Sequence, residues 1–355
     1  MSIPTTSTVT TRSVLRPLLA ALPLVLGATA LHAQEVTIKF SHFLAPNSNF
    51  HKNVAEPWCA AIAKDSGGKL KCQLYPALQL GGTPPQLVDQ VKNGVADVVW
   101  TSPSYSTGRF PITEALELPF SLPPGGMTGS KAMWEYYQKN GQADFKDFHV
   151  LAIFSASNVV MSTASKPILT VDGFKGVKMR SPSRFAALFL TALGGTPVNM
   201  PVAQVTEGIS KGVIDGAMAP WEVLPATKID EVTKYHMEGA PNQPGFTQTP
   251  MAILMNKAKY DGLSPDLKAV IDKNSGLALV ELTGKTWDDG NNDARKKMTA
   301  QGNKVLVIKP EDYNAMKKAA ASVEADWIKQ ADARGLDGKK LAADVHAIGA
   351  KYLGK

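Results

Sequence analysis

One helix-to-strand pattern occurs twice along the chain. Gly82-Thr-Pro opens the first copy, which runs to Trp100, and Gly195-Thr-Pro opens the second, which runs to Met218. In each copy, a proline-containing start leads into a helical run, then a glycine, then an aspartate among apolar residues. Glycine after a helical pattern is typical of a helix C-terminus, and the apolar run after it indicates a buried strand. Two copies of this unit predict two similar α/β lobes with a cleft between them.

Strand-like and helix-like segments alternate along the rest of the chain. Short apolar or β-branched runs predict strands at residues 36–40, 71–75, 98–100, 150–154, 177–180, 251–255 and 304–308. Longer amphipathic runs predict helices at residues 50–64, 85–93, 131–140 and 183–193, and a mainly helical region from Ser264 onward. This alternation is typical of βαβ units and parallel sheets. The predicted fold class is therefore α/β.

The strand at residues 251–255 follows its expected neighbours too late to belong to a simple sequential domain. We therefore interpret residues 154–158 and 247–251 as two crossings between the lobes, with hinges near Ser155 to Asn158 and Thr247 to Pro250. On this division, residues 34–156 with about 250–290 form lobe I, and residues 157–249 with about 291–355 form lobe II. A mature length of about 320 residues fits two lobes better than one core.

An export signal of the Sec type is expected over residues 1–33. Arg12 and Arg16 form its positive start, and the apolar run from Leu18 to Leu26 is shorter than the roughly 20 residues of a membrane span. Two cleavage sites remain open, Ala28-Thr-Ala30 and Leu31-His-Ala33. The mature protein is expected to be soluble and exported, without stable insertion into a membrane.

The charge of the chain argues against a nucleic-acid partner. The formal net charge of +7 includes Arg12 and Arg16, so the mature chain carries about +5. Lysine and arginine alternate with acidic residues, whereas a nucleic-acid binder usually shows a basic stripe with interleaved aromatics. We expect ordinary solubility and a mild attraction for anions.

Cys59 and Cys72 are the two cysteines of the sequence. Cys59 lies in a helix-like stretch and Cys72 at the start of a strand-like run, on consecutive elements. In an oxidising compartment such a pair favours a disulfide. Two free buried thiols or a metal pair are the alternatives, although two cysteines without nearby histidines make a poor zinc site.

Enzymatic signatures are weak. Gly208-Ile-Ser-Lys-Gly212 has the G-x-S-x-G spacing of hydrolases, but that motif needs a strand before Ser210 and a helix after it, and here the order is reversed. The sequence has no H-E-x-x-H, C-x-x-C or G-x-G-x-x-G motif. We expect no cofactor, no metal site and no enzyme activity, with an exported hydrolase using Ser210 as the alternative.

Arg180 is the main candidate for ligand binding. It ends a predicted strand in GVKMRSPSR, at the carboxyl edge where ligands of open α/β sheets bind. A guanidinium group matches a carboxylate through two parallel charge-assisted hydrogen bonds. A structural arginine that caps carbonyl groups or pairs with an aspartate is an equal alternative on position alone.

Several aromatic residues follow strand-like or turn segments, where their side chains could face the cleft or pack in the core. The full set of predicted ligand-binding residues is Arg180, Trp221, Trp100, Tyr105, Phe43, Asn158, Ala219 and Phe246.

Together, a set of short motifs resembles the solute-binding proteins of tripartite ATP-independent periplasmic (TRAP) transporters, of the DctP type named for dicarboxylate uptake. The likeness covers nearly the whole mature chain and rests on Leu74-Tyr-Pro76, Gln79-Leu-Gly81, Gln90-Val-Lys-Asn-Gly94 with Asp97, Leu118-Pro-Phe120, Gly173 to Arg180, Gly194 to Pro201, and Gly212-Val-Ile-Asp-Gly216 with Pro220. It implies a two-lobed periplasmic binding protein with crossing hinge strands and a long C-terminal helix. It also implies delivery of an organic acid, without catalysis, to membrane permease subunits.

The resemblance bears on particular residues. Arg180 matches the family's carboxylate-binding arginine. Sialic acid-binding members carry an asparagine where this chain has Ala219, and a second arginine where it has Val160 or Met161. The missing donor and charge imply a ligand with fewer polar groups than a sugar acid, and we expect a small monocarboxylate, aromatic or hydroxylated. A ligand-binding subunit of a sensor system is a further alternative.

Overall fold

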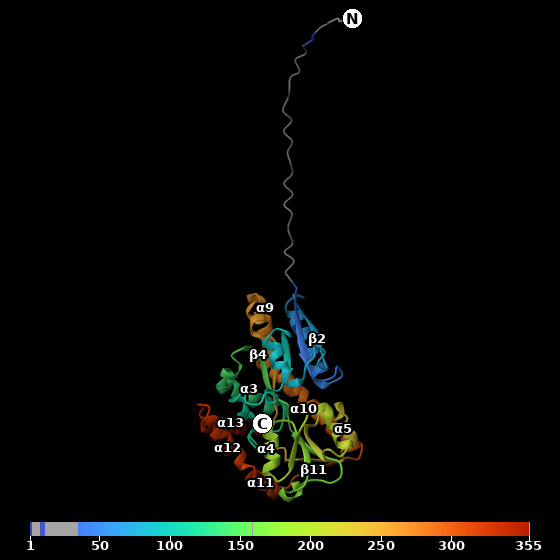
Figure 1. Ribbon diagram of the computed structural model, residues 1–355, viewed down its shortest axis with the longest axis vertical. Coiled ribbons are helices and arrows are strands. Elements are labelled where there is room, and N and C mark those ends of the chain that lie inside the picture. The colour runs from blue at the N-terminus through green and yellow to red at the C-terminus, as the bar shows by residue number, and fades with distance from the viewer. Residues whose placement is uncertain (2–7, 11–34, 158, 355) are drawn as a thin grey trace. The chain divides into compact units, whose positions relative to one another are not determined.

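The computed structural model of this protein describes residues 1, 8–10, 35–157 and 159–354. Residues from Glu35 onward form one compact unit, which holds the strands and helices labelled in Figure 1. The predicted export signal at residues 1–33 lies almost wholly outside the described residues, and so does Asn158. No helix in the described part of the chain is both long enough and apolar enough to span a bilayer.

The first sheet has five strands in the order β2-β1-β3-β10-β4. Their bounds are β1 Val36–His42, β2 Leu70–Tyr75, β3 Val98–Thr101, β4 Phe148–Ser155 and β10 Pro250–Asn256. β1 runs parallel to both β2 and β3, as the alternation of strands and helices predicts. β10 enters the sheet after a long excursion of the chain, and it is antiparallel to β3 and to β4.

The second sheet has six strands in the order β11-β9-β5-β8-β6-β7. Their bounds are β5 Val159–Thr163, β6 Lys178–Ser181, β7 Thr196–Asn199, β8 Gly216–Pro220, β9 Tyr235–Glu238 and β11 Lys304–Val307. β6 is parallel to β7 and β8, whereas β5 is antiparallel to β8 and β9. Each sheet thus combines parallel βαβ strands with one antiparallel strand that enters after a crossing.

The repeated sequence pattern has the same structural meaning in both sheets. Helix α2 (Leu87–Lys92) leads to β3, and helix α5 (Val205–Ser210) leads to β8. Gly94 and Gly212 follow these helices with φ of +74° and +69°, a backbone conformation that glycine adopts without strain. The aspartate of each copy then accepts a hydrogen bond from a backbone N–H of the adjacent parallel strand, Lys39 N to Asp97 and Lys178 N to Asp215, both at 2.8 Å.

The chain crosses between the sheets where the sequence predicts it. β4 of the first sheet is followed directly by β5 of the second, and β9 of the second sheet is followed by β10 of the first. The two crossings are joined by a hydrogen bond of 2.8 Å from Ser155 Oγ to Gln248 Oε1, and Ala156 N donates to Thr249 O at 3.0 Å.

A long helix, α10 (Leu277–Ala300), makes a third link between the sheets (Figure 1). It packs against α3 (Gly126–Asn140) and β4, and its later part contacts β11 of the second sheet. Its Asp288 carboxylate accepts hydrogen bonds from Gly126 N at 2.6 Å and Met127 N at 2.9 Å. These are two of the N–H groups that the first turn of α3 would otherwise leave without a partner.

Further helices cover the sheets. They are α1 Glu56–Asp65, α4 Arg184–Ala192, α6 Val223–Ala226, α7 Ile229–Val232, α8 Lys257–Asp261, α9 Pro265–Lys273, α11 Pro310–Ala319, α12 Ala321–Asp332 and α13 Gly338–Tyr352. Trp327 of α12 and Val345 of α13 are buried in one cluster with Ala252 and Leu254 of the first sheet. The lobe boundaries stay a prediction, but this packing weighs against assigning the whole segment 291–355 to lobe II.

Cys59 and Cys72 form a disulfide with a Cα–Cα distance of 5.6 Å, as predicted. The bond ties α1 to β2 at one edge of the first sheet. Within the described ranges, no group of three histidine, cysteine, aspartate or glutamate residues is placed to hold a metal ion.

Candidate functional site

A cavity is lined by residues of both sheets and of α10, and we call it the central cavity. Its apolar lining consists of Phe43, Leu44, Trp100, Ala156, Pro182, Val202, Pro220, Val223, Met251 and Trp287. Its polar lining consists of Tyr105, Arg180, Glu222 and Thr249.

Arg180 lies on β6, which runs between β8 and the edge strand β7 of the second sheet. Its Nε donates a hydrogen bond to Met200 O at 3.1 Å, and its Nη1 donates to Met218 O at 2.8 Å. These two bonds engage two of the five N–H groups of the guanidinium. Arg180 therefore has donors left for a ligand in the central cavity, and the carbonyl bonds fix their direction.

The charge of Arg180 is not neutralised by a neighbouring acid. No carboxylate among the described residues forms an ion pair with it, and its side chain is 3% exposed. Burial lowers its pKa to about 10, so it stays protonated at neutral pH. A buried cation without a counter-ion is costly unless a ligand supplies the opposite charge. This arrangement favours an anionic ligand and argues against an Arg–Asp pair. Arg180 does bond two carbonyl oxygens, as the alternative of a structural arginine expects.

Tyr105 lines the same cavity as Arg180. It ends a short 3-10 helix, Pro103–Tyr105, that follows β3 of the first sheet. Burial raises the pKa of the Tyr105 hydroxyl, and the positive charge of Arg180 acts in the opposite direction. The two side chains are therefore within electrostatic reach of each other, so a carboxylate bound to Arg180 lies near a hydroxyl donor from the first sheet.

Flat aromatic surfaces form another wall of the cavity. Phe43 stacks on Trp100 with ring centroids 4.6 Å apart, and Phe50 stacks on Trp100 with centroids 3.8 Å apart. The ring of Trp287 meets Trp100 edge-on at 6.0 Å. This stacking covers both faces of Trp100 and fixes the aromatic wall, so Trp100 meets the cavity at its edge. The apolar wall suits an aromatic ring better than a polyhydroxylated one.

Four of the predicted ligand-binding residues thus line the central cavity: Arg180, Trp100, Tyr105 and Phe43. Trp221 does not, because its side chain lies on the opposite side of the chain from Pro220 and Glu222 and donates from Nε1 to Glu238 Oε2 at 2.9 Å.

Ala219 and Phe246 also lie outside the lining. Ala219 is fully buried inside the second sheet, paired with Val160 across β8 and β5. Val160 and Met161, the two candidate positions for the second arginine of sialic acid-binding members, are both apolar and buried. Phe246 packs in a core cluster with Phe120 and Phe189.

The sequence prediction missed Glu222, Thr249, Met251 and Trp287. Glu222 could have been noticed as an acidic residue just beyond the apolar run of β8. Trp287 gives no such signal, because one tryptophan in a long helix reads as an ordinary core residue.

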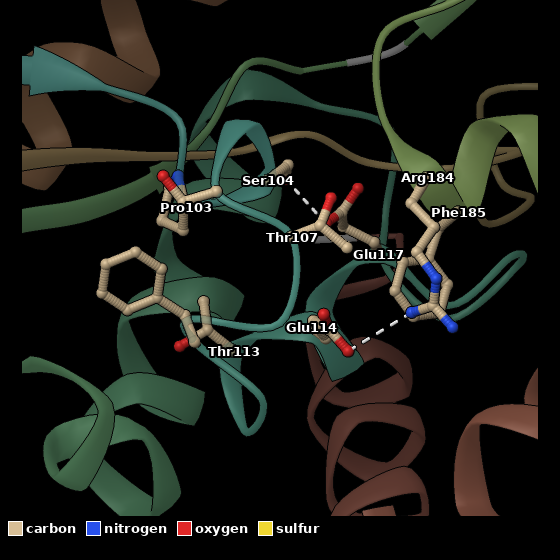
Figure 2. A pocket seen from close by; sticks show the side chains of 10 residues that line it. Pro103, Ser104, Thr107, Thr113, Glu114, Glu117, Arg184 and Phe185 are labelled. Atoms are coloured by element: carbon tan, nitrogen blue, oxygen red, sulfur yellow. Dashed lines mark hydrogen bonds and ion pairs between the residues drawn. The ribbon is translucent and has the colours of Figure 1, made fainter. Parts of the chain in front are cut away.

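A smaller cavity beside α4 contains an acidic cluster, which Figure 2 shows. Ser104 Oγ donates to Glu117 Oε1 at 2.6 Å, and Arg184 Nη1 lies 3.5 Å from Glu114 Oε2. Glu114 and Glu117 belong to a short 3-10 helix, Thr113–Glu117, whereas Arg184 begins α4 of the second sheet. Burial raises the pKa of Glu117 to about 7, although hydrogen bonds from Ser104 and Ser183 act in the opposite direction.

The chain matches known proteins along most of its length. The family model described as "Bacterial extracellular solute-binding protein, family 7" (DctP) matches residues 40–330. The C4-dicarboxylate-binding periplasmic protein DctP of Rhodobacter capsulatus is 29% identical over 291 residues, which are 77% of this chain and 80% of that protein.

Two solved structures are more similar. A TRAP solute-binding protein from a marine metagenome, specific for aromatic acid ligands and solved with 3-hydroxybenzoate, is 43% identical with a TM-score of 0.87. The alignment covers 90% of this chain and 99% of that one. A TRAP solute-binding protein from Rhodoferax ferrireducens T118, solved with copurified benzoate, is 40% identical with a TM-score of 0.85, covering 89% and 98% of the two chains.

The resemblance seen in the motifs thus extends over the fold. The match covers both sheets, the two crossings between them and most of α10 to α12. By family match, sequence identity and fold, this chain belongs to the DctP family of TRAP-transporter solute-binding proteins.

Proposed function

We propose that this protein captures an aromatic monocarboxylate in the periplasm and delivers it to the membrane permease of a TRAP transporter. The observation that carries the proposal is the pairing, in one cavity, of an uncompensated Arg180 with the stacked rings of Phe43 and Trp100. The arginine provides for one carboxylate, and the aromatic wall provides for a flat apolar body.

The similar structures support the same ligand class. Two proteins that are 40–43% identical to this chain were solved with benzoate or 3-hydroxybenzoate. Ala219, and Val160 or Met161, are apolar where sialic acid-binding members carry polar residues, and this favours an aromatic acid over a sialic acid. The periplasmic location rests on the predicted signal and on the named periplasmic relative.

We propose binding without chemical turnover. Ser210, the residue of the alternative hydrolase hypothesis, is exposed at the C-terminal end of α5, and its Oγ donates to Thr206 O at 2.8 Å. It lies outside the lining of the central cavity. The family consists of solute-binding proteins, which is consistent with this reading.

A thermal-shift screen followed by calorimetric titration tests the proposal. The protein is unfolded and refolded first, to remove copurified ligand. Benzoate, 3-hydroxybenzoate and phenylacetate should raise the melting temperature, because a ligand that binds the native state stabilises it. Benzyl alcohol keeps the ring without the carboxylate, and succinate keeps carboxylates without the ring. Neither compound should raise the melting temperature. Binding of succinate together with no response to the aromatic acids would overturn the proposal.

A further inference from the structure

Glu222 is an acidic residue in the wall of the central cavity, at a position that the binding of a simple carboxylate does not explain. Pro220 and Glu222 both line the cavity, while Trp221 between them faces away and bonds Glu238. The same cavity holds Arg180, whose charge already matches one carboxylate. Because the ligand itself brings one carboxylate to that space, the presence of the Glu222 carboxyl group needs a separate explanation.

The position of Glu222 is tightly fixed. Its backbone N–H donates to Asn291 Oδ1 of α10 at 3.1 Å. A side chain at Gly290 of the same helix would place its Cβ 3.2 Å from Glu222 Cβ, so the glycine leaves the space that Glu222 occupies. Glu222 is therefore held against α10, and Trp287, one turn earlier on that helix, lines the same cavity.

The carboxyl group of Glu222 has no hydrogen-bond or ion-pair partner among the residues that the structure describes, and the residue is 8% exposed. Glu222 also borders an outer groove that includes Lys52 and Asp293, and two of the polar side chains of that groove bond other residues. Asn49 Nδ2 donates to Thr286 O at 3.0 Å, and Lys297 pairs with Asp230 at 3.1 Å.

A buried polar group without a partner is unfavourable, and a ligand that supplies the partner is selected over one that does not. Burial raises the pKa of Glu222 to about 8, so the group is largely a neutral acid near neutral pH and does not repel a carboxylate. The indole Nε1 of Trp287 is fully buried without a partner among the described residues, whereas the carboxyl oxygens of Glu222 are not fully buried. A hydroxyl group both donates and accepts, so it satisfies an acid and an N–H donor together.

We infer that Glu222 determines specificity for a ring hydroxyl: its carboxyl group hydrogen-bonds a hydroxyl substituent of the aromatic acid whose carboxylate Arg180 holds. This inference rests on the proposed function and narrows its ligand class from aromatic monocarboxylates to hydroxylated ones.

Calorimetric titration of the refolded protein with benzoate, 3-hydroxybenzoate, 4-hydroxybenzoate and 3-methoxybenzoate tests it. The better of the two hydroxybenzoates should bind about tenfold more tightly than benzoate, the range expected for one added hydrogen bond in a buried site. The methoxy compound, which cannot donate, should show no such gain. Equal affinity of the wild-type protein for benzoate and both hydroxybenzoates would overturn the inference.

Two variants assign the effect to Glu222. In Glu222→Leu the ratio of the affinities for the better hydroxybenzoate and for benzoate should fall below about twofold, and a melting curve shows whether the variant is folded. In Glu222→Gln, which keeps a donor and an acceptor, most of the preference should remain. A full preference in Glu222→Leu would overturn the inference.

A matched control and the ligand panel separate the possible failures. Glu238→Gln changes an equally buried glutamate that lies outside the central cavity, so it should leave the hydroxyl preference unchanged. If wild type binds benzoate but shows no hydroxyl preference, only the role of Glu222 fails. If it binds none of the aromatic acids, the proposed function fails and the inference fails with it.

Discussion

Arg180 donates a hydrogen bond through Nη1 to the main-chain oxygen of Met218, at 2.8 Å, and this bond orients the guanidinium from β6 across to β8. A second bond from Nε to Met200 O holds the other side of the group. The arginine is thus preorganised before a ligand arrives, which reduces the ordering that binding requires.

Arg180→Lys should weaken the binding of benzoate by about ten- to several-hundredfold. Lysine keeps the positive charge but cannot bond two carbonyl groups and also present a fork to the carboxylate. Loss of one hydrogen bond to a charged group costs roughly 1.5–3 kcal/mol, or about 10- to 150-fold, and partial loss of a second bond accounts for the upper part of the range. Calorimetric titration measures it.

Arg184→Lys is the matched control, because Arg184 lies on the following helix and outside the central cavity. Its affinity for benzoate should stay within about twofold of wild type. Melting curves of both variants report folding. Near-normal affinity in Arg180→Lys would show that Arg180 does not bind the carboxylate.

Ligand binding should reduce the radius of gyration. The two sheets are joined at the crossings 156–158 and 239–249 and along α10, so closure is expected as rotation of nearly rigid bodies about these links. Small-angle scattering with and without saturating benzoate measures the change. The same radius in both states would contradict hinge closure.

Removing the disulfide should destabilise the fold without changing ligand affinity. Cys59 and Cys72 close a short loop, with a sequence separation of 13, and the entropy of that loop in the unfolded chain corresponds to about 3 kcal/mol. Neither residue lines the central cavity. The double variant Cys59→Ser/Cys72→Ser should therefore unfold at a lower guanidinium concentration, while its titration with benzoate matches wild type.

Intact-mass measurement checks the redox state directly. The mature protein should resist alkylation until a reductant is added, and should then gain two labels. Labelling of both thiols without reductant would contradict the disulfide.

Glu117→Gln should make the protein less sensitive to pH. The pKa of Glu117 is about 7 in the folded protein, above the ordinary value of 4.5, because burial disfavours the charged form. Stability from this group is therefore complete below about pH 4.5 and decreases as the pH rises to about 7, by on the order of 3 kcal/mol. Glutamine stays neutral, so the variant should lose less stability than wild type between about pH 5 and pH 8.

Melting curves of wild type, Glu117→Gln and Glu207→Gln are compared at about pH 5 and about pH 8. Glu207 is an exposed control that pairs with Lys211 on the surface of α5. An unchanged pH dependence in Glu117→Gln would show that Glu117 does not titrate in this range.

The sequence alone determined the class of fold and its two-part organisation. The repeated units ending at Gly94 and Gly212 are local patterns, in which the glycine conformation and the adjacent aspartate are specified within one segment. The late strand at residues 251–255 revealed the return crossing, because its distance along the chain excluded a sequential domain. Arg180 could be named as a candidate because it stands at the end of a strand, where ligands of α/β sheets bind.

Only the tertiary structure decided which side chains meet in the cavity. Trp100 and Trp221 look alike in the sequence, each just after a strand-like run, yet Trp100 faces the cavity and Trp221 bonds Glu238. Glu222 and Trp287 are 65 positions apart and are brought together by the packing of α10 on both sheets. Which face of a strand end is buried depends on partners that are distant in sequence, so a local pattern cannot specify it.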